Sequence, residues 1–245
     1  MSDTSNWKSA FYASYVSSGQ AVDTGEPAAI LFRPRMAYLN HLVANHIPAS
    51  RDIRILDLAC GAGALLYALG QAGYTNIAGV DVSEEQIAVA RRIGIGSARC
   101  NSLEGFLAEQ SAGSVDVVTA IDIFEHLSRA ELMDVLASIR TVLKPGGRCI
   151  AHVPNAGGLF GMQMRFGDIT HELAFTSSSA SQIFRVIGFK TVRCFEDRPQ
   201  VHGLKSLVRR LLWDVGTLPS RVLLLAESGE GGAILSRNMM IEASL

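Results

Sequence analysis

The sequence predicts an α/β fold in which a mostly parallel sheet is covered by helices on both faces. Short apolar segments alternate with helical segments from residue 53 onwards, as consecutive βαβ units require. Segments such as 114–122 are almost continuously apolar, which is typical of strands buried on both faces. The chain has 245 residues, of which 48% are hydrophobic, so it can bury a sizeable core.

The expected elements follow one another in a regular order. Strands are predicted over the apolar segments 53–59, 76–82, 96–100, 114–122, 148–154, 190–197 and 234–244. Helices are predicted over the segments 64–73, 84–94, 129–143 and 178–189. Ser83 is a candidate N-cap for the second of these helices, and KPGG (144–147) is a turn signal before the fifth strand.

Two segments interrupt this order, and a third precedes it. Residues 155–176 are rich in glycine and too long for an ordinary connection, so we expect a functional loop. Residues 200–228 form a second insertion with a helical pattern. Residues 1–50 lack strand alternation and predict two helices around a connection near 25–27. We therefore expect a helical cover over 1–50 and a main domain over 51–245.

The composition excludes several classes of protein. Only 18% of residues are charged, against about 25% in ordinary soluble domains, which raises the question of a membrane protein. The stretch 149–164, which lacks Asp, Glu, Lys and Arg, contains a proline and three glycines and predicts no membrane span. A net charge of −1 gives no global attraction to nucleic acid. The polar N-terminus and four widely spaced cysteines favour a reducing cytoplasm.

The first strand ends in a glycine turn, DLACGAG (57–63), and the second ends at Asp81. Glycines at such a turn let backbone N–H groups approach a ligand, and an acid about 20 residues later can accept hydrogen bonds from ribose hydroxyls. Taken alone, the turn is also compatible with a tight strand–helix connection that binds nothing.

The combined motifs are more specific. ILDLACGAGALLYAL, GVDVSEEQ, AIDIFEHL and KPGG, in this order, resemble class I S-adenosylmethionine-dependent methyltransferases over roughly 53–197. The resemblance implies a Rossmann-like, mostly parallel seven-stranded sheet and S-adenosylmethionine as cofactor. The turn follows the pattern DxAxGxG, whereas NAD-binding proteins show GxGxxG, and Ala59 stands where the family more often has glycine.

The same resemblance implies a cofactor site made of Asp57, Ala59, Gly61, Gly63, Asp81, Val82, Asn101, Ser102 and Asp122. In this assignment Asp57 and the glycines line the methionine end, and Asp81 holds the ribose. Asn101 falls where the family often has an Asp that contacts adenine. Asp122 would lie beneath the methyl sulfonium, and the alternative for Asp122 is a helix cap.

A narrower resemblance rests on VPNAGG, RFGDITHELAFT, HGLKS and the final NMM. These segments are similar to bacterial methyltransferases encoded with glycan-assembly enzymes, which implies a sugar hydroxyl of a surface glycan or its precursor as acceptor. The alternatives are a methyltransferase of small metabolites or natural products, and a non-catalytic subunit that retains the cofactor fold.

Two clusters of acids and histidines follow the fourth and fifth strands, at the edge of the sheet where ligands bind. DIFEH (122–126) resembles the ExxEH cluster that holds a divalent cation in some ubiquinone-pathway and small-RNA methyltransferases. This implies Glu125, His126 and His171 as ligands of Mg²⁺ or Mn²⁺. The first Glu of that pattern is Asp122 here, one methylene shorter.

The catalytic candidates are His171, His126 and Asp168. One hypothesis is metal-assisted transfer, and the other is metal-free transfer with His171 as the base. The alternatives are purely structural roles, in which His126 packs in the fold and His171 orders its loop through a hydrogen bond to Asp168.

Contacts outside the main domain are also predicted. Tyr12, Tyr15 and Arg33 in the cover are candidates to touch cofactor or acceptor. The insertion 200–228 places leucines and valines at helical spacing with basic residues between them. Such a helix can lie on an anionic membrane, pack on the domain or form a homodimer, so a cytoplasmic protein with peripheral contact at the inner membrane is one expectation.

Overall fold

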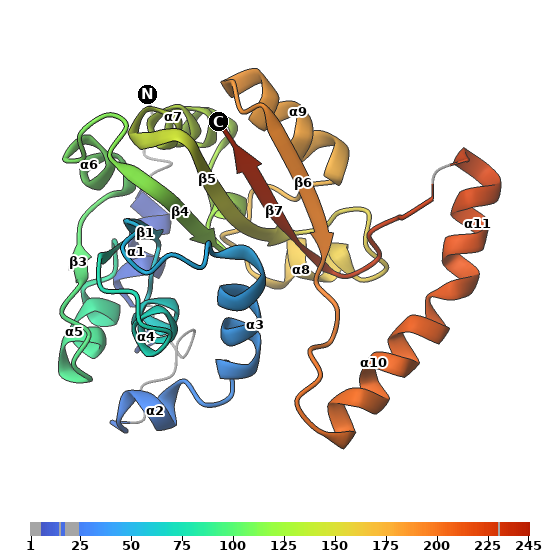
Figure 1. The fold of residues 1–245 in the computed structure, drawn as a ribbon, viewed down its shortest axis with the longest axis horizontal. Helices are drawn as coiled ribbons and strands as arrows, with labels where there is room; N and C mark the ends of the chain where they lie inside the picture. The colour runs from blue at the N-terminus through green and yellow to red at the C-terminus, as the bar shows by residue number, and fades with distance from the viewer. Residues whose placement is uncertain (1–5, 15, 18–24, 230) are drawn as a thin grey trace.

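A computed structural model describes residues 6–14, 16–17, 25–229 and 231–245. It shows a central sheet with helices on both sides and a long helical arm at one end (Figure 1). The strands are β1 (Ile55–Leu58), β2 (Ile77–Asp81), β3 (Ala98–Cys100), β4 (Val115–Ile121), β5 (Leu143–Pro154), β6 (Thr191–Glu196) and β7 (Asn238–Ser244). The helices are α1 (Asn6–Ala13), α2 (Ala28–Leu31), α3 (Met36–His46), α4 (Ala64–Gln71), α5 (Glu84–Arg92), α6 (Leu103–Ala108), η1 (Phe124–His126), α7 (Arg129–Val142), α8 (Gly161–Gly167), α9 (Ser177–Ile187), α10 (Leu204–Gly216) and α11 (Leu218–Ser228).

The sheet has seven strands in the order β3-β2-β1-β4-β5-β7-β6. All neighbouring pairs are parallel except those of β7, which runs antiparallel to both β5 and β6. Parallel strands joined through crossover helices place their carboxyl ends at one edge of the sheet. The loops after β1, β2, β4 and β5 therefore meet there, which confirms the predicted fold class.

The core lies in two layers, one on each face of the sheet. On β5 the alternation is visible: Cys149, Ala151 and Val153 belong to the layer under α6, α7 and α9, whereas Ile150 belongs to the layer under α3 and α4. All four of these side chains are fully buried. A strand covered on both faces has no polar face, which explains its low charge content.

The helix starts agree with their sequence signals. Ser83 caps α5, with its hydroxyl accepting a hydrogen bond from the Gln86 amide. Ser128 and Glu131 form a capping box at the start of α7, and Thr176 caps α9. Each cap satisfies backbone N–H groups that the helix itself leaves free.

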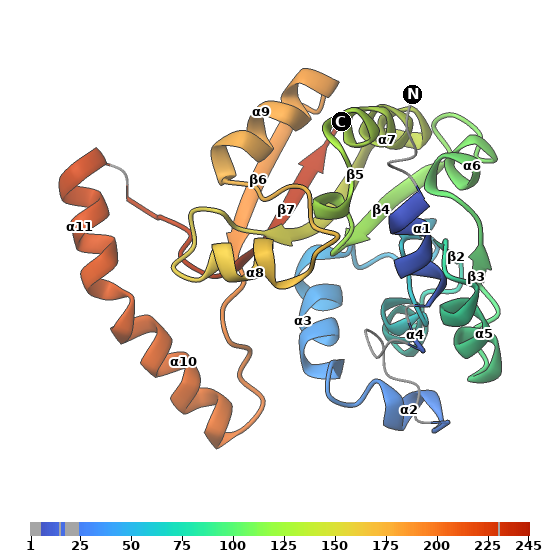
Figure 2. The ribbon, with the colours of Figure 1, turned by 180° about the vertical axis from the view of Figure 1, so that it is seen from behind.

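The structure differs from the predicted elements at three places. The described part of the N-terminal segment contains three helices rather than two, because the four-residue helix α2 follows Pro27 directly. The predicted loop 155–176 contains α8, which lies near the end of β5 (Figure 2). The predicted turn 144–147 falls within β5, where the pairing with β4 shifts register and Gly146 has a φ of 77°.

The second insertion forms α10 and α11, which together make the arm that stands away from the body in both ribbon views (Figures 1 and 2). Within the described part of the chain, every helix is too short or too polar to cross a membrane. Tyr15, one of the candidates in the cover, lies outside the described residues.

Candidate active site

The turn between β1 and α4 has an unusual backbone. Ala59, Gly61 and Gly63 all have positive φ values, of 54°, 56° and 84°. At Gly63 an added Cβ would lie 2.9 Å from Cδ1 and 3.0 Å from Cγ2 of Ile95, so a side chain there would meet both strain and a clash. Ala59 adopts the same left-handed region without glycine's freedom, which indicates that the surrounding contacts hold the turn.

Asp81 fixes this turn from the end of β2. One carboxylate oxygen accepts a hydrogen bond from the Gly61 amide at 2.9 Å, and the other accepts one from the Ser83 amide at 2.8 Å. Burial raises the pKa of Asp81, and these two donors work in the opposite direction. Val82, the next residue, is 47% exposed at the same edge.

Asp57 lies deeper than the sequence suggested. Its side chain is buried and accepts a hydrogen bond of 2.6 Å from the Thr119 hydroxyl on β4. Burial is the main reason that the pKa of Asp57 is raised to about 7. Asp57 therefore supports the turn from below, and its contact with the cofactor stays a prediction.

Asn101 and Ser102 build the start of α6. The Asn101 carbonyl oxygen accepts a hydrogen bond from the Ser102 amide at 2.8 Å, and its amide nitrogen donates to Glu109 at 3.0 Å. The Ser102 hydroxyl caps α6 by accepting from the Gly105 amide at 3.0 Å. Their role at the adenine end also stays a prediction.

Asp122 follows β4 with a φ of 55° and points to a histidine that sequence reasoning missed. Its carboxylate lies 2.5 Å from Nδ1 of His152 on β5, and Nε2 of His152 lies 3.4 Å from the Asp197 carboxylate. The cap hypothesis for Asp122 is wrong, because Ser128 caps α7 and the residue before η1 is Ile123.

This arrangement holds a buried charge. Burial alone would lower the pKa of His152, but the two carboxylates more than offset it and raise the pKa to about 10. Burial alone would raise the pKa of Asp122, and His152 beside it keeps that pKa below the usual range. Asp122, His152 and Asp197 thus form an ion-paired network at the carboxyl ends of β4 and β5.

Helix α3 closes over this network. The Tyr38 ring lies 5.7 Å from the His152 ring, and its hydroxyl is buried without a hydrogen-bond partner among the described residues. Burial, followed by the nearby Asp197 and Asp122, raises the pKa of Tyr38. The positive charge of Arg35, the residue before α3, lowers the pKa values of both Asp57 and Asp122.

The sequence predicts Arg33, two residues before Arg35, as the arginine of the cover that contacts cofactor or acceptor. Arg33, which was the predicted candidate, is exposed in the connection between α2 and α3. Arg35 is exposed in the same connection, and its charge acts on Asp57 and Asp122, so a single sequence offers no signal that separates one arginine of RPR from the other.

The acids and histidines after β4 and β5 do converge. Glu125, His126 and His171 each present one possible ligand atom, and these atoms all lie within 4.8 Å of one another. The rings of His126 and His171 are 4.5 Å apart between centroids. Two segments 45 residues apart in sequence thus form one cluster, as their places after neighbouring strands predicted.

Hydrogen bonds fix the orientation of both rings. The Thr170 hydroxyl donates to Asp168 at 2.6 Å, so it accepts the hydrogen bond of 2.8 Å from Nδ1 of His126. Nδ1 of His171 donates to the Met164 carbonyl at 2.7 Å. In both rings Nε2 is then the nitrogen that carries the lone pair.

Asp168 has two roles in the loop. The predicted loop-ordering hydrogen bond between Asp168 and His171 is present in the backbone, where the His171 amide donates to the Asp168 carbonyl at 3.2 Å. The Asp168 side chain bonds to the hydroxyl and amide of Thr170, and not to the His171 ring. Through Thr170 this carboxylate acts on His126.

Glu125 is the least satisfied group of the cluster. Its side chain is buried, and Oε2 has no hydrogen-bond partner among the described residues. Burial is the main cause that raises the pKa of Glu125 to about 8, and burial also lowers the pKa of His126 to about 4. A buried carboxylate oxygen without a donor is costly unless something outside the chain satisfies it.

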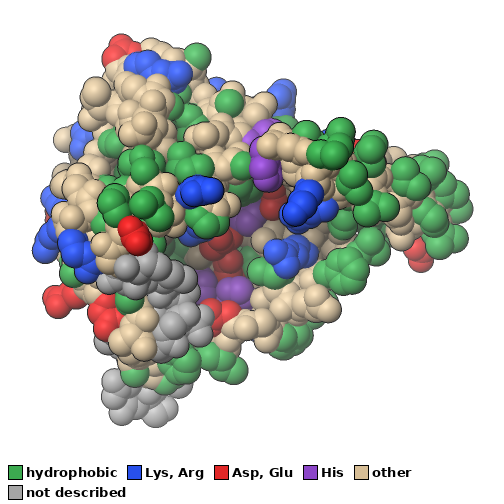
Figure 3. Space-filling model, turned by 90° about the horizontal axis from the view of Figure 1, so that it is seen from below, with side chains coloured by type: hydrophobic (Ala, Val, Ile, Leu, Met, Phe, Trp, Pro, Cys, Tyr) green, Lys and Arg blue, Asp and Glu red, His purple; other side chains and the backbone are tan. Residues whose placement is uncertain are grey.

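The cover reaches this cluster through α1. Lys8 donates a hydrogen bond of 2.7 Å to the His126 carbonyl and forms an ion pair with Glu172. The Tyr12 ring lies 6.4 Å from the His126 ring. Figure 3 shows histidine and acidic side chains together in the hollow of this face, with basic side chains at its rim.

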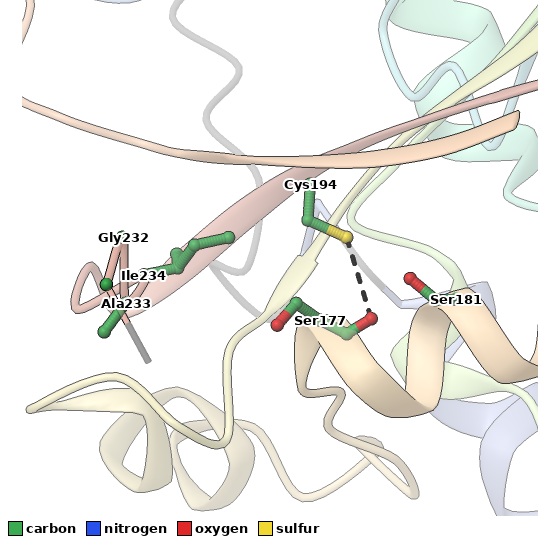
Figure 4. Close-up of a pocket in the computed structure, with 7 residues that line it drawn as sticks. Ser177, Ser181, Cys194, Gly232, Ala233 and Ile234 are labelled. Carbon is green, nitrogen blue, oxygen red and sulfur yellow. Dashed lines mark hydrogen bonds between the residues drawn. The ribbon is translucent and has the colours of Figure 1, made fainter. Parts of the chain in front are cut away.

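A second hollow lies away from the cluster. It has a volume of about 280 Å³ and lies between the start of α9, β6 and residues 231–234 (Figure 4). Cys194 lines it, with Sγ 4.0 Å from the Ser177 carbonyl oxygen. None of the predicted site residues lines this hollow.

Comparison with known proteins agrees with this geometry. Residues 55–147 match a family model described as a methyltransferase domain. Over 111 residues the chain is 32% identical to the ubiquinone biosynthesis O-methyltransferase of Idiomarina loihiensis, which covers 43% of this chain and 44% of that protein. The enzyme of the same name from Pseudomonas aeruginosa is 34% identical over 99 residues, 39% of this chain and 41% of that protein. The chain thus matches less than half the length of these relatives.

Solved structures extend the likeness to the whole fold. A methyltransferase from Archaeoglobus fulgidus superposes with a TM-score of 0.65 at 20% identity, covering 87% of this chain and 96% of that one. The phosphoethanolamine N-methyltransferase 2 of Haemonchus contortus, solved with S-adenosyl-L-methionine, gives 0.63 at 17% identity over 95% of this chain and 59% of that one. Residues 55–147 therefore match a methyltransferase domain, and the chain has the fold of solved S-adenosylmethionine-dependent methyltransferases.

Proposed function

We propose that the chain transfers the methyl group of S-adenosylmethionine to an acceptor hydroxyl held at Glu125, His126 and His171. The observation that carries this proposal is the buried, unpartnered Oε2 of Glu125 beside two oriented imidazoles. This cluster follows β4, next to the strand whose glycine turn is the predicted cofactor site.

The cofactor would bind along the turn 59–63. Backbone N–H groups there suit the methionine end, and Asp81 keeps lone pairs for ribose hydroxyls beyond its two amide donors. The Arg35 guanidinium suits the methionine carboxylate. The Asp122–His152–Asp197 network carries two negative charges against one positive charge, which suits a cationic sulfonium nearby.

The cluster fits a divalent cation. In both imidazoles the hydrogen bond uses Nδ1, so the lone pair of Nε2 is available to a metal ion. One carboxylate and two imidazoles are a common donor set for Mn²⁺ and related ions, and Mg²⁺ also binds carboxylates. The cation would bind the acceptor oxygen and lower its pKa. Thr170 and the Met164 carbonyl hold the two rings in place, and burial keeps water away from Glu125.

The metal-free mechanism uses the same residues differently. His171 would take the proton of the acceptor hydroxyl at Nε2, while Nδ1 keeps its own proton in the hydrogen bond to the Met164 carbonyl. Glu125 would then orient the hydroxyl by accepting a hydrogen bond. Both mechanisms require His171, and only one requires a cation.

The acceptor class has two sources of support. The narrower resemblance of the sequence supports a sugar hydroxyl, and the relatives named ubiquinone biosynthesis O-methyltransferase support an acceptor from that pathway. The loop that carries His171 also exposes apolar side chains, namely Leu159, Phe160, Met162, Phe166 and Ile169. This favours an acceptor with an apolar portion over a free, fully polar sugar.

The test is methyl transfer from radiolabelled S-adenosylmethionine to two acceptor panels, one of catechols with apolar substituents and one of glycosides with vicinal hydroxyls. We expect turnover on at least one panel, and a loss of about a hundredfold or more in Glu125→Gln and His171→Asn. His202→Asn, at an exposed histidine outside the cluster, is the matched control and should retain turnover. Wild-type rates in both cluster variants would exclude the proposed site.

Chelation separates the two mechanisms. Loss of turnover in EDTA and recovery with Mn²⁺ or Mg²⁺ would support the metal-assisted mechanism, and full turnover after exhaustive chelation would exclude it. Calorimetric binding of S-adenosylmethionine without turnover on either panel would instead favour the non-catalytic subunit.

A further inference from the structure

The arm is nearly one continuous helical rod. Two i→i−4 hydrogen bonds span the junction of α10 and α11, from the Thr217 amide to the Trp213 carbonyl at 3.0 Å and from the Arg221 amide to the Thr217 carbonyl at 3.1 Å, whereas Pro219 has no N–H to donate. Thr217 itself has right-handed helical φ and ψ values of −86° and −10°. From Leu204 to Ser228 the rod is about 37 Å long at 1.5 Å per residue.

The face of the rod that meets the body is mainly polar, and it also includes the partly buried Trp213 and Leu224. Its fully buried residues are Ser206 and Thr217, whose hydroxyls donate to the carbonyls of Gly203 and Trp213. Arg221 forms an ion pair with Glu196 of β6, at 2.6 Å and 2.8 Å to the two oxygens, and donates to the Ala233 carbonyl at 2.6 Å. Polar contacts thus attach the rod to the domain.

The apolar face of the rod points outward. Seven residues on this face, which we call the outer seam, are between 47% and 78% exposed. The outer seam consists of Leu204, Val208, Leu211, Val215, Leu218, Val222 and Leu225. Within α11, which is described throughout, no residue is buried. This amphipathicity is the reverse of that of a helix that packs on its own domain.

The spacing of the outer seam identifies the kind of partner. Its residues are separated alternately by four and three positions, which is a heptad repeat sustained over three heptads. Leucine occupies every d position and valine every a position. In this arrangement a β-branched residue at a and leucine at d favour two parallel strands.

A second copy of the chain satisfies this pattern better than a lipid surface. A membrane accepts any broad apolar face, so it requires neither a 3.5-residue period nor the alternation of valine and leucine. The rod carries basic side chains, but Asp214 and Glu227 lie exposed among them and would face anionic headgroups.

We propose that the chain forms a homodimer in which the outer seams of two rods pair in parallel as a two-stranded coiled coil. The polar faces then stay against the two bodies, which lie on opposite sides of the paired rods. Figure 3 shows the arm projecting at the right with hydrophobic side chains gathered on it, beyond the hollow of the candidate active site.

The test is sedimentation equilibrium of the full chain over roughly a hundredfold range of concentration. We expect the wild type to be a dimer and Leu211→Glu to raise the dissociation constant by about a hundredfold or more, because the charge falls at the centre of the seam. Leu223→Glu is the matched control: Leu223 is 70% exposed on the same rod but lies outside the seam, so this variant should stay dimeric. Circular dichroism should show unchanged helix content in both.

A charge pair tests the parallel arrangement. In a parallel pair Leu211 faces its own copy, so a mixture of Leu211→Glu and Leu211→Lys should form a heterodimer, whereas each variant alone stays monomeric. A monomeric wild type, or a dimer that Leu211→Glu leaves intact, would overturn the proposal. A monomer that co-floats with phosphatidylglycerol vesicles would assign the outer seam to a membrane and also overturn it. Failure of the mixture to associate would overturn the parallel pairing.

Discussion

Thr170→Val tests whether the orientation of His126 matters for the reaction. Valine has nearly the shape of threonine, so the buried site keeps its packing, but the hydroxyl that links Asp168 to His126 is lost. Asp168 retains the Thr170 amide at 2.8 Å, because that donor belongs to the backbone. The change therefore removes one specific interaction, the acceptor for Nδ1–H of His126.

The expected magnitude follows from this single loss. A buried N–H donor left without an acceptor costs about 1 to 3 kcal/mol. If the ring turns away to avoid that cost, Nε2 leaves the cluster, and about 2 kcal/mol corresponds to a fall of roughly 30-fold in kcat/KM. This lies within the 10- to 100-fold effect typical of residues that orient metal ligands.

The assay compares kcat/KM for methyl transfer, the concentration of activating cation at half-maximal rate, and the free energy of unfolding in urea. Thr170→Ser keeps the hydroxyl and should lie close to the wild type in all three. A loss of stability alone, with kcat/KM and cation requirement unchanged in the folded variant, would show that Thr170 is structural. The role of Thr170 and Asp168 in positioning His126 would then be refuted.

Three further outcomes are expected. Gly63→Ala should lower the free energy of unfolding by about 1 to 3 kcal/mol, since it imposes a Cβ at a φ of 84°, whereas Gly96→Ala, in open space, should change it little in the same urea titration. Wild-type stability should fall as the pH rises from about 7 to 10, because the pKa of His152 is raised to about 10 when folded and is about 6.5 when unfolded. The ion pairs of His152 stabilise the fold fully below the pKa of His152 in the unfolded state, and this stabilisation is lost as the pH rises through its pKa of about 10 in the folded state. His152→Gln should therefore make the free energy of unfolding less dependent on pH in this range. Arg221→Met should make the arm more sensitive to limited proteolysis, as it removes the ion pair that attaches α11 to β6.

Local signals account for the parts of the structure that the sequence predicts correctly. The glycine turn is visible because positive φ favours glycine, and Ser83 is visible because its hydroxyl caps the helix that begins one residue later. The convergence of Glu125 and His171 follows from topology, since both come after neighbouring parallel strands. Each of these inferences needs only spacing along the chain or the order of strands.

Contacts between distant segments could not be predicted in the same way. His152 lies inside an apolar strand, and its partner Asp197 is 45 residues away on a different connection. Met164 enters the site through its carbonyl oxygen, which every residue type provides equally. That the Asp168 side chain bonds to Thr170 rather than to the His171 ring depends on loop geometry of a few ångströms.

The low charged fraction has two physical sources that lead to different consequences. In the sheet, strands such as β4 are apolar because both faces are buried, and this portion is ordinary core. In the arm, the apolar side chains lie outside, where a single chain gains nothing from them. An exposed seam with a heptad period is maintained only if another surface covers it, so the composition that first suggested a membrane protein is better explained by self-association. Because the seam lies outside the candidate active site, its disruption should change assembly and leave the chemistry of the cluster intact.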